Sequence, residues 1–196
     1  MRLAIFGGTF DPVHKAHLAV AREAIRVCAL DRILLVPAAI PPHKHRPDCA
    51  TYEDRYRMLE LACAGEPGLE PSRLEERNAK SYSIHTIERV RAKLTPADSL
   101  FFIIGADAFA EIDTWYRWRD VAAAVEFIVV DRPGHQYKAP PGARVHRLQT
   151  LNLPTSSSEI RKRIARGEEP GELAPAVMGY IRDKRLYRST GVHAPA

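Results

Sequence analysis

Two histidines near the start of the chain have the spacing of a pair that can hold one phosphate group. His14 and His17 are three residues apart, so on a helix they share a face. They follow the glycine pair Gly7-Gly8, where the backbone can turn sharply and come close to a ligand. Two imidazoles beside the positive end of a helix dipole suit a polyphosphate whose negative charge rises during reaction. These residue types therefore indicate phosphate chemistry.

The segments around the histidines predict a strand, a tight loop and a helix. The apolar run Leu3–Phe6 is typical of a strand, and Asp11-Pro12 is typical of a helix N-cap followed by proline at the first helical position. The free N–H groups of that helix would face an anion. The dinucleotide fingerprint G-x-G-x-x-G lacks its third glycine, which disfavours a redox cofactor. A plainer interpretation also stands, in which the glycines only close a turn and the histidines are ordinary polar residues.

A second helix start, late in the chain, is rich in hydroxyl groups. The segment Thr155–Ser158 precedes Glu159 and Arg161. Serine hydroxyls and free N–H groups can hold phosphate oxygens, and an arginine one turn into the helix can grip a phosphate with two N–H groups. Alternatively, the hydroxyls serve only as an N-cap, with Glu159 favouring the helix dipole. The residues alone leave both interpretations open.

Hydrophobic periodicity predicts an α/β protein with a doubly wound parallel sheet, helices on both faces and further helices towards the C-terminus. The clearest central strand is Leu100–Ile104. We expect other strands at 33–37, within 65–72 and at 127–130, and helices at 18–30, 52–63, 83–94, 157–166 and 174–187. Residues 134–144 are typical of a surface loop. We expect residues 1–188 to form one domain and residues 189–196 to be a disordered tail.

Composition and charge restrict the class of protein. The 196 residues carry a net charge of +5, but the basic residues are spread along the chain, so small phosphorylated substrates explain the charge as well as nucleic acid does. The three cysteines, Cys28, Cys49 and Cys63, suggest neither a disulfide framework nor a zinc site, and we expect Cys28 and Cys63 in helix cores. The chain has no run long enough for a membrane span and no signal pattern, so we expect a cytoplasmic protein without membrane contact.

The first motif, G-G-T-F-D-P-V-H-x-x-H, resembles the N-terminal signature of the nucleotidyltransferase superfamily, a glycine turn followed by an H-x-G-H histidine pair. The segment Thr155–Arg161 resembles the I-S-S-T-x-I-R motif of the same superfamily, with Thr155 and Ser158 as mild departures. The resemblance implies a Rossmann-like nucleotidyltransferase fold. Ala16 stands where the family has glycine. Its methyl group is tolerable if the local dihedrals are helical, and harmful if phosphate contact needs glycine.

Three further segments narrow the resemblance to the bacterial nicotinate-nucleotide adenylyltransferases. They are P-P-H-K at residues 41–44, S-Y-S-I at residues 81–84, and G-A-D-A-F at residues 105–109 followed by Trp115-Tyr116. The motifs occur in the order expected of the family, and the resemblance runs from residue 3 to about residue 187. Together they are far more specific than any one of them.

The resemblance also implies roles for individual residues. Groups that neutralise phosphate charge would be His14, His17, Lys44 and Arg161. Groups that bind ATP would be Gly7, Gly8, Thr9, Phe10, Gly105, Asp107, Ser157 and Ile160. Groups that bind the nicotinate nucleotide would be the Trp115 ring by stacking, the Ser83 hydroxyl, and the backbone N–H groups of Ile84 and Tyr116. Without the resemblance, Trp115 would be interpreted as a packing residue.

The implied reaction is adenylyl transfer, in which the 5′-phosphate of nicotinate mononucleotide attacks the α-phosphorus of ATP and pyrophosphate leaves. A phosphate monoester is nucleophilic at neutral pH, so alignment and charge neutralisation would supply the catalysis. Mg²⁺ would arrive with ATP rather than at a metal site of the protein, and Asp11 would reach it only through water. The partners would be these two nucleotides, and the sequence leaves a homo-oligomer open.

Two rival functions share part of this pattern. Another small nucleotidyltransferase, of the pantetheine-phosphate adenylyltransferase or cytidylyltransferase type, has the first motif, but Trp115, the Gly-Ala-Asp segment and Arg161 disfavour it. A basic nucleic-acid-binding module would bind oligonucleotides with a steep salt dependence. The sequence has no visible platform of aromatic and basic residues, so no nucleic acid partner is expected.

Overall fold

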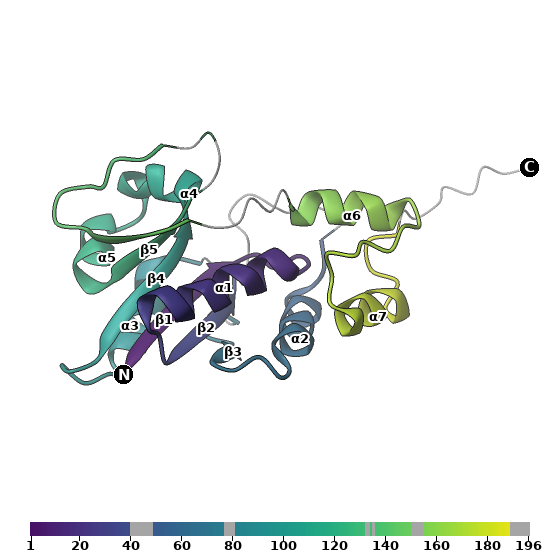
Figure 1. Ribbon diagram of the computed structural model, residues 1–196, viewed down its shortest axis with the longest axis horizontal. Helices are drawn as coiled ribbons and strands as arrows, with labels where there is room; N and C mark the ends of the chain where they lie inside the picture. The colour runs from purple at the N-terminus through teal and green to yellow at the C-terminus, as the bar shows by residue number, and fades with distance from the viewer. Residues whose placement is uncertain (40–48, 77–80, 132–133, 135, 150–154, 189–196) are drawn as a thin grey trace, which may run out of the picture.

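The computed structural model describes residues 1–39, 49–76, 81–131, 134, 136–149 and 155–188 (Figure 1). Its centre is a six-stranded parallel sheet with the strand order β3-β2-β1-β4-β5-β6. The strands are β1 (Arg2–Gly8), β2 (Arg32–Pro37), β3 (Leu69–Pro71), β4 (Ser99–Gly105), β5 (Glu126–Val130) and β6 (Arg144–Leu148). The predicted doubly wound parallel sheet is confirmed.

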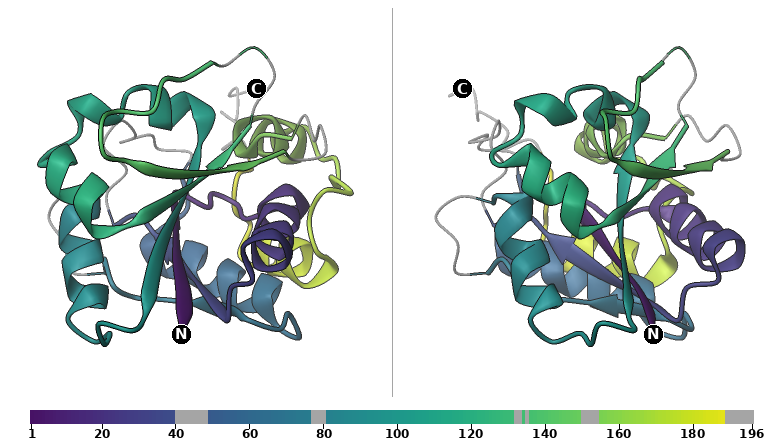
Figure 2. Two further views of the ribbon diagram at one scale, coloured as in Figure 1. Left: turned by 60° about the vertical axis from the view of Figure 1, so that its left-hand side comes forward. Right: turned by 90° about the vertical axis from the view of Figure 1, so that its left-hand side faces the viewer.

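Helices cover both faces of this sheet, and the left-hand view of Figure 2 shows the sheet between the two groups. Helices α1, α2, α6 and α7 contribute to the core on one face, and α3, α4 and α5 contribute to the core on the other. Their bounds are α1 (Lys15–Cys28), α2 (Tyr52–Cys63), α3 (Ser83–Arg91), α4 (Ala106–Ala110), η1 (Ile112–Thr114, a 3-10 turn), α5 (Trp118–Ala124), α6 (Ser157–Ala165) and α7 (Pro175–Asp183).

Alternate side chains of each central strand enter the two cores. In β1, Ala4 belongs to the core under α1, whereas Leu3 and Ile5 belong to the core under α3. Because both faces are covered, a strand such as β4 is apolar along its length rather than alternating. This continuous pattern is the reason that the central strands were recognisable in the sequence.

The first helix begins later than the sequence predicts. His14 is its N-cap, with φ −143° and ψ 169°, and Lys15 is its first residue. Asp11 and Pro12 lie in a turn before it, so the prediction that Asp11 caps the helix is wrong. The carboxylate of Asp11 is buried and accepts hydrogen bonds from Tyr187 and Ala50, which draw it away from the helix start.

Strand β6 and the short helices α4 and α5 were not anticipated. The β6 sequence R-V-H-R-L has three basic or imidazole side chains at the edge of the sheet and offers no apolar run to detect. The other predicted strands and helices are present, with ends that shift by a few residues. The P-P-H-K segment and the tail at 189–196 lie outside the described residues, and the single domain at 1–188 stays a prediction.

Cys28 and Cys63 are the last residues of α1 and α2 and are buried, as predicted for helix core positions. Burial raises the pKa of both thiols, to about 12 for Cys63, so neither is primed for reaction at neutral pH. None of the helices within the described ranges is long and apolar enough to cross a membrane.

The winding of the sheet reverses between β1 and β4. The chain leaves β1 towards β2 on one side and later enters β4 on the other side. The carboxyl ends of these two strands, at Gly8 and Gly105, therefore border a crevice. Open α/β sheets bind their ligands in the crevice at this switch point. The fold thus places both predicted glycine motifs at one site.

The two glycines at the end of β1 have different steric surroundings, and this difference is testable. A Cβ added at Gly8 would lie 3.0 Å from Cζ of the buried Phe10 ring, whereas at Gly7 the nearest atom would be 3.8 Å away. We expect Gly8→Ala to lower the free energy of unfolding by about 1–3 kcal/mol, because the added methyl group would force the buried Phe10 ring to shift. Gly7→Ala should change it by less than about 1 kcal/mol. Urea denaturation of both variants measures the difference, and equal stabilities would show that the Phe10 ring moves freely.

Candidate active site

A single cavity of about 2060 Å³ opens at the carboxyl ends of β1 and β4. Pockets for one small ligand have volumes of roughly 300–1,000 Å³, so this cavity has room for two nucleotides. The walls include the end of β1, the loop after it and the starts of α1 and α6. Predicted ATP-site residues in the walls are Gly7, Gly8, Thr9, Phe10, His14, His17, Gly105, Asp107, Ser157 and Arg161. The sequence motifs therefore converge in space.

His14 and His17 come together at the start of α1. Their rings are stacked, with centroids 3.8 Å apart and planes 28° from parallel. The backbone N–H of His14 donates to Nδ1 of His17 at 3.2 Å. Because Nδ1 accepts this bond, a neutral His17 carries its proton on Nε2, which makes Nε2 a donor for an anion. The Phe10 ring packs against His17 at 5.0 Å and limits its movement.

Ala16 is the second residue of α1 and also lines the cavity. Its helical position meets the condition under which alanine is a tolerable replacement for glycine. The start of α1 is less open to an anion than predicted, because the Lys15 N–H donates to the carbonyl of Glu172 at 2.8 Å. At this helix start, an anion would therefore be bound by the histidine side chains more than by free backbone N–H groups.

The loop between β1 and α1 is held by side chains that donate to its carbonyl oxygens. Arg55 of α2 donates to Thr9 at 2.8 Å, Arg161 of α6 donates to Asp11 at 2.7 Å, and the Ser157 hydroxyl donates to Pro12 at 3.0 Å. Arg55 also donates to Ala38 at 2.7 Å, just after β2, and burial lowers its pKa. Two helices thus fix the loop from two sides.

Asp11 is 1% exposed and belongs to the loop that α2 and α6 hold in place. Its Oδ1 accepts hydrogen bonds from the Tyr187 hydroxyl at 2.7 Å and from the Ala50 N–H at 3.1 Å. Its Oδ2 is 3.6 Å from Nη1 of Arg161. Burial beside this carboxylate raises the pKa of Tyr187 well above its ordinary value, so Tyr187 stays a donor. Asp11 is therefore a structural anchor, and its carboxylate does not suit a metal ion at the cavity surface.

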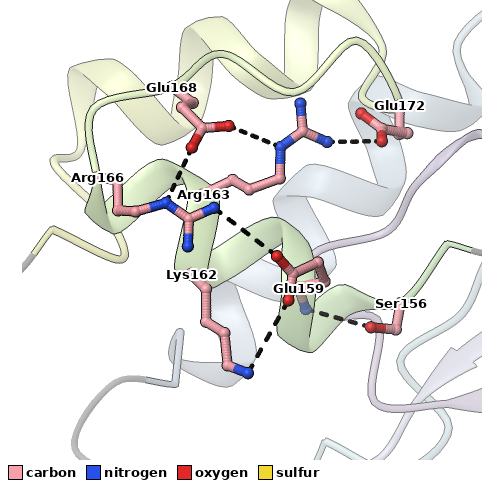
Figure 3. Close-up of polar contacts among 7 residues, drawn as sticks. All are labelled: Ser156, Glu159, Lys162, Arg163, Arg166, Glu168 and Glu172. Atoms are coloured by element: carbon pink, nitrogen blue, oxygen red, sulfur yellow. Dashed lines mark hydrogen bonds and ion pairs between the residues drawn. The ribbon is translucent and has the colours of Figure 1, made fainter.

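Helix α6 is capped by Ser156, whose Oγ accepts the Glu159 N–H at 3.2 Å (Figure 3). Ion pairs then join its outer face to the following loop, and Arg163 binds both Glu168 at 2.9 Å and Glu172 at 2.7 Å (Figure 3). The loop from 168 to 172 carries the carbonyl that accepts from Lys15 at the start of α1. These contacts set α6 against α1, with Ser157 and Arg161 in the cavity wall.

The nicotinate side of the predicted site is only partly assembled from side chains. Ser83 and Trp115 line the cavity, and the half-buried Trp115 ring also meets Phe102 edge-on at 6.0 Å. Ile84 lies in the core at 2% exposure, and Tyr116 is 53% exposed and packs against Tyr82. The predicted contribution of both residues is a backbone N–H group, and it stays a prediction.

The remaining predicted residues are found in different places. Ile160 is 1% exposed and packs in the core under α6, so its side chain holds the helix rather than a ligand. Lys44 lies outside the described residues. Asp107 and Gly105 are in the cavity wall at the end of β4, as expected from the Gly-Ala-Asp segment.

Several residues of the site were missed in the sequence. Thr86 and Glu75 form a buried pair in the cavity wall, with the hydroxyl donating to Oε1 at 2.6 Å. Thr86 could have been noticed as a polar residue on the apolar face of α3, but Glu75 is in an irregular segment that gives no signal. Arg55 and Tyr187 are also buried polar anchors whose partners are distant in the sequence.

Comparison with known proteins agrees with this geometry. The family model described as cytidylyltransferase-like matches residues 5–163. A probable nicotinate-nucleotide adenylyltransferase of Solibacter usitatus is 60% identical over 187 residues, which cover 95% of this chain and all of the relative. A protein of the same description from Frankia casuarinae is 40% identical and covers 93% of this chain and 98% of its own length.

The fold is also shared with solved structures. Plasmodium falciparum nicotinic acid mononucleotide adenylyltransferase in complex with NaAD superposes with a TM-score of 0.75 over 95% of this chain and 97% of that one, at 19% identity. The same enzyme in complex with APC gives a TM-score of 0.74. At this identity the likeness concerns the fold, whereas the sequence relatives establish the family. The chain belongs to the cytidylyltransferase-like family and, within it, to the nicotinate-nucleotide adenylyltransferases.

Proposed function

We propose that the protein joins nicotinate mononucleotide to ATP, giving nicotinate adenine dinucleotide and pyrophosphate for NAD biosynthesis. The observation that carries this proposal is the single cavity whose walls contain both the stacked histidines and the pair Ser83 and Trp115. ATP bound beside the histidines and nicotinate mononucleotide bound beside Ser83 and Trp115 would meet within the same cavity. A cytoplasmic location follows from the small nucleotides that such an enzyme uses.

The reaction is a direct displacement. An oxygen of the 5′-phosphate forms a bond to the α-phosphorus of ATP, and the bond from that phosphorus to the bridging oxygen of pyrophosphate breaks. The leaving group keeps the electron pair, so no general base is needed for a phosphate that is already ionised. The Nε2–H of His17 suits a phosphate oxygen whose negative charge rises in the transition state. His14, Arg161 and Lys44 would add neutralising groups.

Mg²⁺ would enter with ATP, held by phosphate oxygens and water. Magnesium in phosphoryl-transfer sites commonly keeps several waters and needs few protein ligands. Asp11 does not fit as a direct ligand, because its carboxylate is buried and accepts from Tyr187 and Ala50. Chemically, the ion supplies charge neutralisation on the phosphates and needs no dedicated protein cage.

The nicotinate ring would stack on Trp115, and its carboxylate would meet the start of α3. Ser83 and Ile84 are the first two residues of this nine-residue helix, where N–H groups lack partners within the helix. Such N–H groups favour a carboxylate over a neutral amide. The start of α3 would therefore explain a preference for nicotinate mononucleotide over nicotinamide mononucleotide.

The proposed reaction is tested directly with Mg²⁺-ATP and either nicotinate or nicotinamide mononucleotide. We expect dinucleotide and pyrophosphate from the acid and much less from the amide, because backbone N–H groups meet the carboxylate. Chromatography of the dinucleotide and a coupled pyrophosphate assay measure both products. Equal rates would contradict the carboxylate pocket, and no product from either would contradict the proposed acceptor.

His17→Ala should lower kcat at least about a hundredfold, which is the scale for removing one preorganised donor from a transition state. His146→Ala is the matched control, because this histidine lies on β6 and contacts Glu126 at 2.8 Å. Steady-state kinetics on both variants, with folding checked by circular dichroism, gives the comparison. Near-normal turnover of folded His17→Ala would remove His17 from the mechanism.

Trp115→Ala should mainly raise KM for nicotinate mononucleotide, by roughly 5- to 150-fold, because stacking of a base on an aromatic ring contributes about 1–3 kcal/mol. The KM for ATP should change little. Trp118→Ala is the control, since Trp118 begins α5 and its ring lies under Arg119 at 4.6 Å. An unchanged KM for the nicotinate nucleotide would make Trp115 a packing residue.

A further inference from the structure

We propose that Tyr187 is a positioning residue for the ATP site, acting through the Asp11 carboxylate on Arg161. This inference rests on the proposed function, because it assigns Tyr187 an effect on ATP rather than on the nicotinate nucleotide. Tyr187 follows α7 and is 176 positions from Asp11 in the sequence. The C-terminal segment would thereby control the geometry of a loop formed at the other end of the chain.

The contact between the two residues is direct and shielded from water. The Tyr187 hydroxyl donates to Oδ1 of Asp11 at 2.7 Å, and the two residues are 9% and 1% exposed. A buried carboxylate is stable only when its oxygens are hydrogen-bonded or paired with charge. Removing the hydroxyl takes away the hydrogen bond from Tyr187 to Oδ1 and leaves the one from the Ala50 N–H. The carboxylate would then be free to turn towards other donors.

Arg161 is the group through which this change would reach a substrate. Its Nη1 donates to the Asp11 carbonyl at 2.7 Å and lies 3.6 Å from the Asp11 carboxylate. Arg161 is 5% exposed and lines the cavity beside Ser157. The carboxylate is the charged neighbour of this guanidinium, so a turn of the carboxylate changes the direction in which the guanidinium is attracted. Tyr187 therefore fixes a cation on the phosphate side of the cavity.

A second tyrosine of the same C-terminal region provides a matched control. The Tyr180 hydroxyl donates to Oδ1 of Asp54 at 2.9 Å, on α2. Both tyrosines thus join the C-terminal region to an aspartate, but only Tyr187 contacts the loop beside the histidines. Replacing either by phenylalanine removes one hydroxyl and keeps the ring.

The first experiment compares Tyr187→Phe and Tyr180→Phe with the wild-type protein in steady-state kinetics. For Tyr187→Phe we expect kcat/KM for ATP to fall about tenfold, with KM for ATP raised and KM for nicotinate mononucleotide within about twofold of wild type. Tyr180→Phe should stay within about twofold in every parameter. A purely structural role would lower the active fraction and leave both KM values unchanged, which would overturn the proposal.

The second experiment tests whether Tyr187 acts through Arg161. In an Arg161→Lys background the added Tyr187→Phe change should cost less than about twofold, because the group that it positions is already altered. Independent, multiplicative losses would contradict action through Arg161. If Tyr187→Phe does not fold, Asp11→Asn gives the same test, since it keeps the shape of the side chain and removes the charge beside Arg161. A KM for ATP unchanged in folded Asp11→Asn would also overturn the proposal.

Binding of a non-hydrolysable ATP analogue with Mg²⁺, measured by calorimetry, separates this inference from the proposed function. If the wild-type protein binds the analogue but gives no dinucleotide, the proposed acceptor fails, and weaker binding to Tyr187→Phe than to Tyr180→Phe still supports the positioning role. Equal binding to the two variants contradicts it. A wild-type protein that does not bind the analogue contradicts both.

Discussion

The burial of one negative charge organises the functional end of this protein. The Asp11 carboxylate is out of reach of water, and its stability requires donors from elsewhere in the fold. Hydrogen bonds come from Ala50, just before the α2 cap, and from Tyr187 after α7, and the Arg161 guanidinium of α6 adds an ion pair. Four segments that are distant in the sequence therefore have to be in place together. The loop that follows Gly8 and leads to the histidines is shaped by this requirement.

The two stacked imidazoles depend on the same arrangement. The end of β1 fixes Gly8, the buried Phe10 ring lies against it, and the ring in turn packs against His17. On the other side, the loop at 171–172 accepts from both the backbone and the side chain of Lys15. His17 is therefore bounded by an aromatic ring and by the first turn of its own helix. The pair is preorganised before any phosphate enters, which is what electrostatic catalysis requires.

The sequence predicted those parts of the fold and site whose physical signal is local. Continuous apolar runs such as Leu100–Ile104 identified central strands. The spacing of His14 and His17 identified a convergent pair, because the N-cap and the third helical residue lie over one another at a helix start. The Asp11 carboxylate was misread as a helix cap, since its real partner Tyr187 is 176 positions away and no local pattern reveals it. Arg55 and Glu75 were missed for the same reason: a buried charge is set by its tertiary partners. Strand β6 was missed because an edge strand with charged side chains has no apolar run.

The charged edge of the sheet has a consequence for how copies of this chain meet. Strand β6 ends the sheet and, among the residues that the structure describes, pairs only with β5, so its other side offers backbone groups to an extended segment. Arg144 and Arg147 are both exposed on this strand. Addition of a second β6 strand would bring like charges against each other. The same basic side chains that hid the strand from sequence inspection therefore discourage edge-to-edge aggregation.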